Sequence, residues 1–238
     1  MSPHVLPHAL KIPAIEKLKG KKIILASNSP RRKEILRTFG LAPEIVPSTF
    51  AEDLLISDFS TPHEYPVATA THKAVQVYEK VVGENPEEAP DLVIAADTVV
   101  LTHPQPVTSD TSYSLLPPQN QELLEKPSSK EDNLRMLLDM NGNVCEVVTG
   151  LAVVLQVQRS IDERSLVYFA DSPKHIVEAY VESGEGIDRA GGFAIQGLGG
   201  ILIRKIEGDY NNVVGFPAAS FFKLLDMLVE EDDDFLSV

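Results

Sequence analysis

The chain has 238 residues, of which 43% are hydrophobic, and a formal net charge of −14. This length permits a sizeable core in one large domain or two small ones, and the composition is that of a globular protein. The sequence contains no apolar run of membrane-spanning length, so we expect no membrane partner. The acidic excess argues against duplex nucleic acid as a partner, because a polyanion would be repelled over most of the surface.

Cysteine usage and the first residues predict the compartment. Cys145 is the only cysteine, which excludes an internal disulfide and is typical of a reducing compartment. Its valine neighbours favour a buried strand residue over a catalytic thiol. Prolines at positions 3, 7 and 13 interrupt the first apolar residues, so we expect no secretory signal. These features predict a cytoplasmic protein and leave nuclear presence open.

The stretch from Lys21 to Gly40 predicts a strand, a turn and a helix. It follows an extension at residues 1–19, and we expect Lys17, Lys19, Lys21 and Lys22 to be solvated. Residues 23–26 form the short apolar run of a buried strand, and residues 27–29 (SNS) are turn formers. Ser29 suits the cap of the helix, Pro30 its first position and Gly40 its end.

Arg31 and Arg32 lie in the first turn of this helix, where cations oppose the helix dipole. Local helix stability therefore does not explain them. A bound phosphate would, because free backbone N–H groups and the hydroxyls of Ser27 and Ser29 also face the helix start. The alternative is that the arginines are surface charges or pair with nearby carboxylates.

Two further stretches contain charged candidates. We expect a strand at 42–49, then Glu52 and Asp53 in a polar loop, then a helix at 62–82 that contains Lys73. Residues 91–101 (DLVIAADTVVL) predict a buried strand interrupted by Asp97. A carboxylate there is costly unless it is paired, hydrogen-bonded or bound to metal. We therefore predict a functional Asp97, the alternative being a structural ion pair.

The rest of the chain predicts alternating elements. First come a loop insertion at 102–121 and a helix at 128–140, with Leu134, Leu137 and Leu138 facing inward. Strands at 144–157 and 165–170 follow, separated by a polar turn at 158–164, and then a helix from the cap Ser172 to Gly184. The last segments are a glycine-rich stretch at 186–200, a strand at 201–206, a helix at 216–229 and an acidic tail at 231–238. The glycine-rich segment either cradles a ligand or forms tight turns. The histidines lack zinc-ligand spacing, so we expect no zinc site.

Several short motifs, in order along the chain, give this sequence its resemblance to the Maf family of nucleoside triphosphate pyrophosphatases. The resemblance covers residues 21 to 230 approximately. The motifs are 25–32 (LASNSPRR), 73–74 (KA), 96–98 (ADT), 125–127 (EKP), 180–184 (YVESG), 188–191 (DRAG), 195–200 (IQGLGG) and 214–217 (VGFP).

The resemblance implies an α/β fold, with a mixed central sheet flanked by helices and a cleft, similar to Maf proteins and inosine triphosphatases. It implies one Maf-like domain at residues 20–230, commonly in a homodimer. The implied activity is hydrolysis of a nucleoside triphosphate to the monophosphate and pyrophosphate, with Mg²⁺ or another divalent cation such as Mn²⁺. The motifs look like the branch that acts on dTTP and UTP, a housecleaning reaction on the nucleotide pool, rather than the sister branch that acts on 7-methyl-GTP.

The resemblance also implies roles for individual residues. Asp97 matches the proton acceptor for the attacking water, or a metal ligand, and Glu52 matches a second site carboxylate. Arg31, Thr98 and Gln196 match positions associated with the choice of base. The whole predicted set is catalytic Asp97, Glu52, Lys126 and Lys73, metal-binding Asp97 and Glu52, and substrate-binding Ser27, Ser29, Arg31, Arg32, Thr98, Asp188 and Gln196.

The chemistry of the substrate agrees with this set. A triphosphate carries about four negative charges, which arginines, lysines and a divalent cation would neutralise. Attack on phosphorus then requires an oriented water more than a covalent nucleophile. The amide of Gln196 can read a pyrimidine edge. The residues alone favour a turn-stabilising side chain for Gln196, and ordinary surface lysines for Lys73 and Lys126.

Two features depart from the family pattern. His72 precedes Lys73 where glutamate is common, and the insertion at 102–121 replaces a short turn. The alternative function is a nucleotide-binding regulator of growth or division with little turnover, and modified pyrimidine nucleotides are further candidate substrates. Retention of Asp97, Glu52 and Lys126 favours an enzyme.

Overall fold

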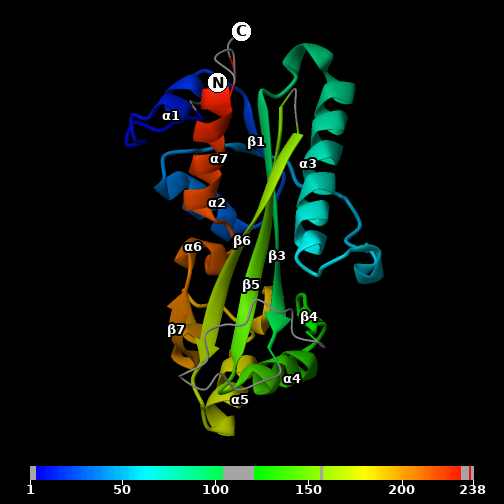
Figure 1. Ribbon diagram of the computed structural model, residues 1–238, viewed down its shortest axis with the longest axis vertical. Helices are drawn as coiled ribbons and strands as arrows, with labels where there is room; N and C mark the ends of the chain where they lie inside the picture. The colour runs from blue at the N-terminus through cyan, green and yellow to red at the C-terminus, as the bar shows by residue number, and fades with distance from the viewer. Residues whose placement is uncertain (1–3, 104–120, 156–157, 232–235, 237–238) are drawn as a thin grey trace. The chain divides into compact units, whose positions relative to one another are not determined.

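The computed structural model describes residues 4–103, 121–155, 158–231 and 236. The predicted insertion and acidic tail therefore lie almost entirely outside the described residues. The described strands form a sheet in the order β2-β1-β3-β5-β6-β7, with β4 paired to β3. β1 pairs in parallel with β2 and β3, whereas the β3–β4 and β6–β7 pairs are antiparallel. The sheet is therefore mixed and helices flank it, as predicted (Figure 1).

The chain divides into two compact units. Unit 1 comprises Met1–Asp97, Thr149–Glu163 and Gly215–Val238, and unit 2 comprises Thr98–Val148 and Arg164–Val214. Three long strands contribute residues to both units: β3 (Leu92–Thr102), β5 (Val144–Val154) and β6 (Gln158–Phe169). The other elements of unit 1 are α1 (Pro13–Lys17), β1 (Ile23–Leu25), α2 (Pro30–Thr38), β2 (Glu44–Ile45), η1 (Ile56–Asp58), α3 (Glu64–Glu84), η2 (Pro86–Glu88) and α7 (Ala218–Glu231).

The core of unit 1 depends on the close approach of α3 to the sheet. Ala70, Ala74 and Val77 of this helix pack with small and branched side chains of β1, β3 and β5. Gly150 marks the point of closest approach, because a Cβ there would lie 2.3 Å from the Pro66 backbone. Small residues on facing elements therefore set the position of α3, the helix that contains Lys73.

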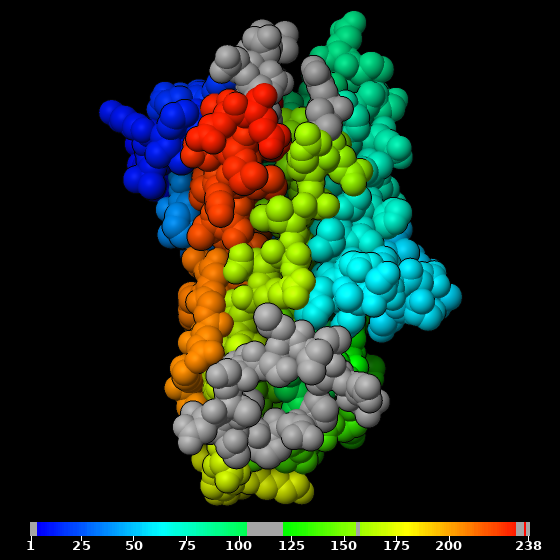
Figure 2. All heavy atoms as spheres, viewed as in Figure 1, coloured from blue at the N-terminus to red at the C-terminus, as the bar shows by residue number. Residues whose placement is uncertain are grey.

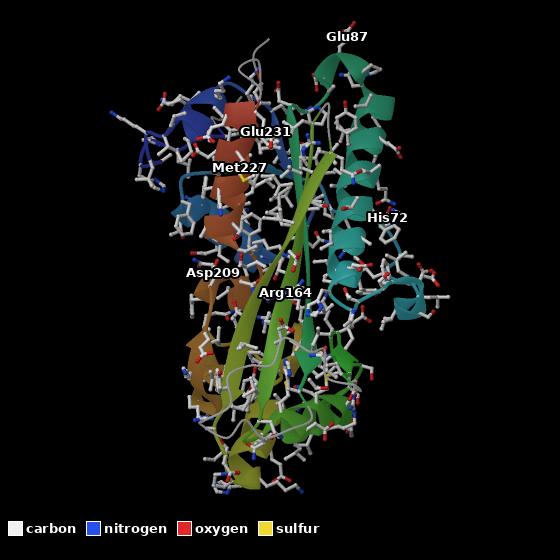
Figure 3. The ribbon with its side chains drawn as sticks, viewed as in Figure 1. His72, Glu87, Arg164, Asp209, Met227 and Glu231 are labelled. Atoms are coloured by element: carbon white, nitrogen blue, oxygen red, sulfur yellow. The ribbon has the colours of Figure 1, made fainter. Side chains whose placement is uncertain are left out.

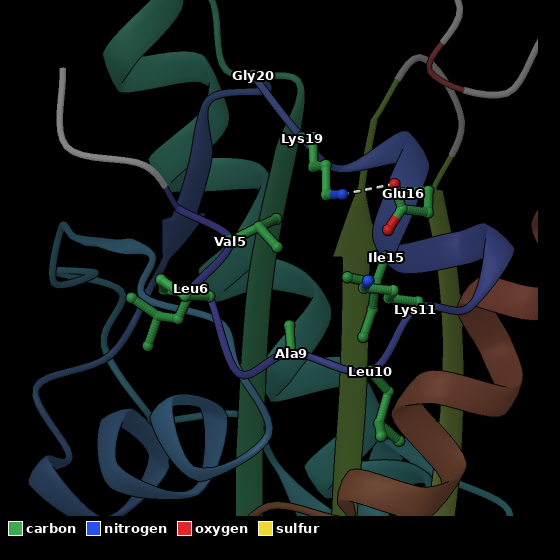
Figure 4. A pocket seen from close by; sticks show the side chains of 10 residues that line it. Val5, Leu6, Ala9, Leu10, Lys11, Ile15, Glu16, Lys19 and Gly20 are labelled. Carbon is green, nitrogen blue, oxygen red and sulfur yellow. Dashed lines mark hydrogen bonds and ion pairs between the residues drawn. The ribbon is translucent and has the colours of Figure 1, made fainter.

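The N-terminal segment is part of unit 1. Val5 forms an antiparallel bridge with Leu41, and the Leu6 N–H donates to the Gly40 carbonyl at 2.8 Å. Gly40 has φ +89°, and a Cβ there would lie 2.3 Å from that of Ala9. A half-open pocket of about 290 Å³, lined by residues between Val5 and Gly20, lies in this segment and includes none of the predicted site residues (Figure 4).

The prediction that the lysines before β1 are solvated was wrong for Lys21 and Lys22, which form ion pairs. Lys21 Nζ lies 3.5 Å from Asp91 Oδ1, and Lys22 Nζ lies 3.7 Å from Glu88 Oε2. The acidic partners come from the η2 region, nearly 70 residues later in the chain, so local sequence could not predict these pairs.

Unit 2 contains β4 (Leu123–Leu124), α4 (Lys130–Met140), α5 (Lys174–Ser183), η3 (Ala190–Gly192), η4 (Leu198–Leu202), β7 (Ile203–Glu207) and α6 (Tyr210–Val214). Its core joins Met136 and Leu137 of α4 to Val177 and Tyr180 of α5. Ser129 caps α4 by accepting a hydrogen bond from the Asp132 N–H. Cys145 is buried in β5, and burial raises the pKa of its thiol, so a strand residue rather than a nucleophile is confirmed.

Several local predictions were wrong. The polar residues 158–164 belong to β6, whose first half is largely exposed and therefore lacks an apolar pattern. The predicted strand at 42–49 shortens to β2, and the short helix α6 was missed. Pro173, not Ser172, is the N-cap of α5, and Leu138 is 37% exposed rather than inward. Among the described residues, no helix combines the length and apolar character needed to cross a membrane.

Candidate active site

The turn between β1 and α2 places serine and arginine side chains together. Ser27 is buried, and its Oγ accepts hydrogen bonds from the Ser29 N–H at 3.1 Å and from Arg32 Nη1 at 3.3 Å. Arg32 Nε also donates to the Gly215 carbonyl at 2.9 Å, which fixes the guanidinium across the turn. Ser29 is the N-cap residue and Pro30 is in the first turn as predicted, but the Ser29 side chain makes no capping bond.

A second group of predicted residues meets at Lys73. The ammonium of Lys73, in α3, lies 2.7 Å from Glu52 Oε1 and 2.8 Å from Asp97 Oδ1. The side chains of Lys73 and Asp97 are each 10% exposed, whereas that of Glu52 is 44% exposed. Asp97 is therefore the buried end of the cluster, and Glu52 is the end that solvent and ligands reach.

Burial and neighbouring charges set the ionisation of this cluster. Desolvation raises the pKa of Asp97, and the nearby Glu52 charge acts in the same direction. Lys73 and Arg32 act against this rise but do not cancel it. Burial lowers the pKa of Arg32, while the charges of Asp97 and Glu52 act in the opposite direction. Asp97 is therefore more basic than an ordinary aspartate, as a proton acceptor requires.

The predicted residues of unit 2 lie in three places. Thr98 is half-buried in β3, directly after Asp97. Lys126 Nζ lies 3.6 Å from Asp188 Oδ1, and both side chains are largely exposed, so the pair contributes little to stability. Gln196 is exposed in the turn before η4.

A carboxylate that the sequence analysis did not select supports the turn containing Gln196. Glu185 accepts hydrogen bonds from the N–H groups of Leu198 at 3.1 Å and Gly199 at 3.0 Å. A Cβ at Gly197 would lie 2.0 Å from Glu185 Oε1, so a larger residue there would displace this carboxylate. Tyr180 supports the same segment, since its hydroxyl accepts from the Ala194 N–H at 3.0 Å. The signal that could have revealed Glu185 was its place between a motif and the glycine-rich segment.

The structure therefore joins the predicted residues in three groups. Ser27, Ser29 and Arg32 share the turn, Glu52, Lys73 and Asp97 share the ion-pair cluster, and Lys126 pairs with Asp188. Arg32 also interacts electrostatically with the two carboxylates of the cluster. Arg31 is half-buried beside Arg32.

The cluster can supply oxygen ligands to a divalent cation. Within the described ranges, no group of three or more His, Cys, Asp or Glu residues is placed to bind a metal ion. Two carboxylates instead suit Mg²⁺, which keeps several waters and takes its other oxygens from substrate phosphates. Each carboxylate has a second oxygen that its bond to Lys73 does not use.

The fold and the cluster define a mixed α/β protein whose buried carboxylate, second carboxylate and cations suit a phosphate-bearing ligand. Residues 22–228 match the family model described as Maf-like protein, and the chain belongs to this family. The resemblance drawn from the motifs is thereby confirmed.

The chain is also similar to individual proteins from three eukaryotes. The chain is 40% identical over 222 residues to a human protein named "Probable bifunctional dTTP/UTP pyrophosphatase/methyltransferase protein", covering 90% of this chain but only 33% of that protein. It is 36% identical over 229 residues to the dTTP/UTP pyrophosphatase of Schizosaccharomyces pombe, covering 91% and 87% of the two chains. The dTTP/UTP pyrophosphatase of Saccharomyces cerevisiae is 37% identical over 219 residues, covering 84% and 88%.

Proposed function

We propose that this protein is a nucleoside triphosphate pyrophosphatase that hydrolyses dTTP and UTP to the monophosphate and pyrophosphate. The observation that carries this proposal is the cluster of Glu52, Lys73 and Asp97, in which one ammonium contacts two carboxylates within 2.8 Å. The names of the relatives, dTTP/UTP pyrophosphatases at 36% and 37% identity, support the choice of substrate.

In the proposed mechanism, Asp97 accepts the proton of the attacking water. Its raised pKa makes it a stronger base than an ordinary aspartate, while Lys73 at 2.8 Å orients the carboxylate. Lys73 also offsets part of the negative charge that Glu52 and Asp97 carry before the proton is transferred. The turn with Ser27 and Arg32 would bind phosphate oxygens through hydroxyl, guanidinium and backbone N–H groups.

Glu52 would bind Mg²⁺, or Mn²⁺ in its place, and Asp97 would be a second ligand as the alternative to its role as proton acceptor. The cation would neutralise phosphate charge and polarise the bond that breaks. Because Lys73 already contacts both carboxylates, it would also limit their repulsion before the cation binds. A metal titration of the nucleotide-dependent reaction, with Ca²⁺ as a non-supporting control, tests this step.

Base choice is assigned to Arg31, Thr98 and Gln196. The exposed amide of Gln196 offers a donor and an acceptor to a pyrimidine edge. Lys126 and Asp188 form an exposed and therefore weak ion pair. A polyphosphate could replace Asp188 as the partner of Lys126, because it would bind the lysine more strongly than one carboxylate does. We further propose that the protein is a homodimer, which light scattering of the purified chain tests, and that it is cytoplasmic, which microscopy of the tagged protein in cells tests.

The decisive experiment measures pyrophosphate release over a panel of dTTP, UTP, CTP, dATP, GTP and 7-methyl-GTP with Mg²⁺. We expect preference for dTTP and UTP, and loss of release in Asp97→Asn. Asp226→Asn, an exposed change in α7, is the matched control. No release from any nucleotide by a folded chain would overturn the proposal. Tight binding without turnover would support a nucleotide-binding regulator instead.

A further inference from the structure

The segment that leads to Glu52 lies against α3 through an aromatic stack. The rings of Phe50 and His72 are 4.9 Å apart between centroids and are inclined by only 8°. His72 is exposed on α3 directly before Lys73 (Figure 3). The stack therefore fixes the chain two residues before Glu52, beside the lysine that Glu52 contacts.

A second contact from the same face of α3 holds the residues before Phe50. Gln76 Oε1 accepts hydrogen bonds from the Thr49 N–H at 2.9 Å and from Ser48 Oγ at 2.5 Å. Ser48 Oγ in turn accepts from the Phe50 N–H at 3.0 Å. His72 and Gln76 are four residues apart, so they lie one above the other on the helix surface.

From Ala51 onwards the chain is largely exposed. Residues 51–53 are exposed, as are the apolar side chains of Leu55 and Ile56, at 64% and 46%. This part of unit 1 stands out from its surface (Figure 2). An exposed ion pair alone does not order such a loop, because the pair is weak in water and the ordering costs backbone entropy.

We propose that His72 is a positioning residue that, by stacking on Phe50, places the carboxylate of Glu52 against Lys73. Nothing in this role requires His72 to touch a substrate or to titrate. A flat ring at position 72 is sufficient, since parallel-displaced aromatic rings attract at this separation. The effect on catalysis rests on the proposed function, whereas the effect on the loop does not.

Two measurements on the full-length chain test the proposal. The first is hydrogen–deuterium exchange of the amides of residues 49–53, which reports local opening without any nucleotide. The second is kcat/KM for dTTP with Mg²⁺. The variants are His72→Ala, His72→Phe, Phe50→Ala and the double variant of His72→Ala with Phe50→Ala, and Glu79→Ala is the control because Glu79 is exposed on the same helix.

We expect His72→Ala to accelerate exchange and to lower kcat/KM by about two- to tenfold, the range of an aromatic pair. His72→Phe should match the parent protein, and the double variant should be no worse than Phe50→Ala. Exchange in His72→Ala equal to that in Glu79→Ala would overturn the proposal. Faster exchange with unchanged kcat/KM would also overturn it. A parent protein that hydrolyses nothing would refute the proposed function, and the exchange measurement would still decide the role of His72.

Discussion

Replacement of Lys73 by methionine removes the one ammonium shared by Glu52 and Asp97. The Lys73–Asp97 distance is 2.8 Å with both side chains 10% exposed, so the loss leaves Asp97 buried with a weaker set of cations. Breaking a buried ion pair lowers the free energy of unfolding by about 3–5 kcal/mol. We expect the lower end, about 3 kcal/mol, because Arg32 still attracts Asp97 in the variant. The exposed Glu52 contact adds little. In a chain of 238 residues, about 3 kcal/mol corresponds to a fall in Tm of about 6–12 °C.

The loss of stability in Lys73→Met should depend on pH in one direction. The pKa of Asp97 in the folded protein is already above its ordinary value, so its ionisation lowers stability as pH rises through that pKa. Removing the Lys73 charge raises this pKa further. The difference in Tm between the parent protein and Lys73→Met should therefore be largest at high pH and shrink as pH falls and Asp97 becomes protonated.

Thermal unfolding followed by circular dichroism between pH 4 and pH 9 measures this difference. Lys80→Met is the control, since Lys80 is exposed on the same helix. If Lys73→Met and Lys80→Met unfold within about 1 °C of each other, or if their difference does not change with pH, the Lys73–Asp97 pair does not stabilise the fold in this way.

Three further changes have defined outcomes. Asp97→Asn should lower kcat about 10²- to 10⁴-fold in the pyrophosphate assay, because it removes the proton acceptor; an active variant would exclude Asp97 as the base. Gly40→Ala should lower Tm more than Gly20→Ala. Both glycines have positive φ, but only a Cβ at position 40 would clash with Ala9. Equal melting temperatures would mean that the N-terminal segment does not pack against Gly40. Glu185→Ala should lower stability by about 1 kcal/mol, because the part-buried Gly199 N–H loses its acceptor whereas water can replace it at the exposed Leu198, and it should weaken the preference for dTTP over CTP; unchanged preference would separate this turn from base choice.

The sequence alone determined the elements with strong local signals. The strand before Ser27 and the helix that begins at Pro30 follow from an apolar run, turn formers and a proline at the first position, all within a few residues of each other. The cost of burying Asp97 in an apolar strand was also readable, because a central carboxylate conflicts with its neighbours whatever the fold. The order of the motifs identified the family, because each motif retains its residues at its own place along the chain.

Only the tertiary structure decided which charges meet. Glu52, Lys73 and Asp97 are far apart in sequence, and the close packing of α3 on the sheet brings them within hydrogen-bonding distance. The stack of His72 on Phe50 and the support of the glycine-rich turn by Glu185 likewise depend on contacts between separate segments. Hydrophobic periodicity reports which face of an element is buried, but not which partner covers it. The pairing of polar side chains follows from how those buried faces pack.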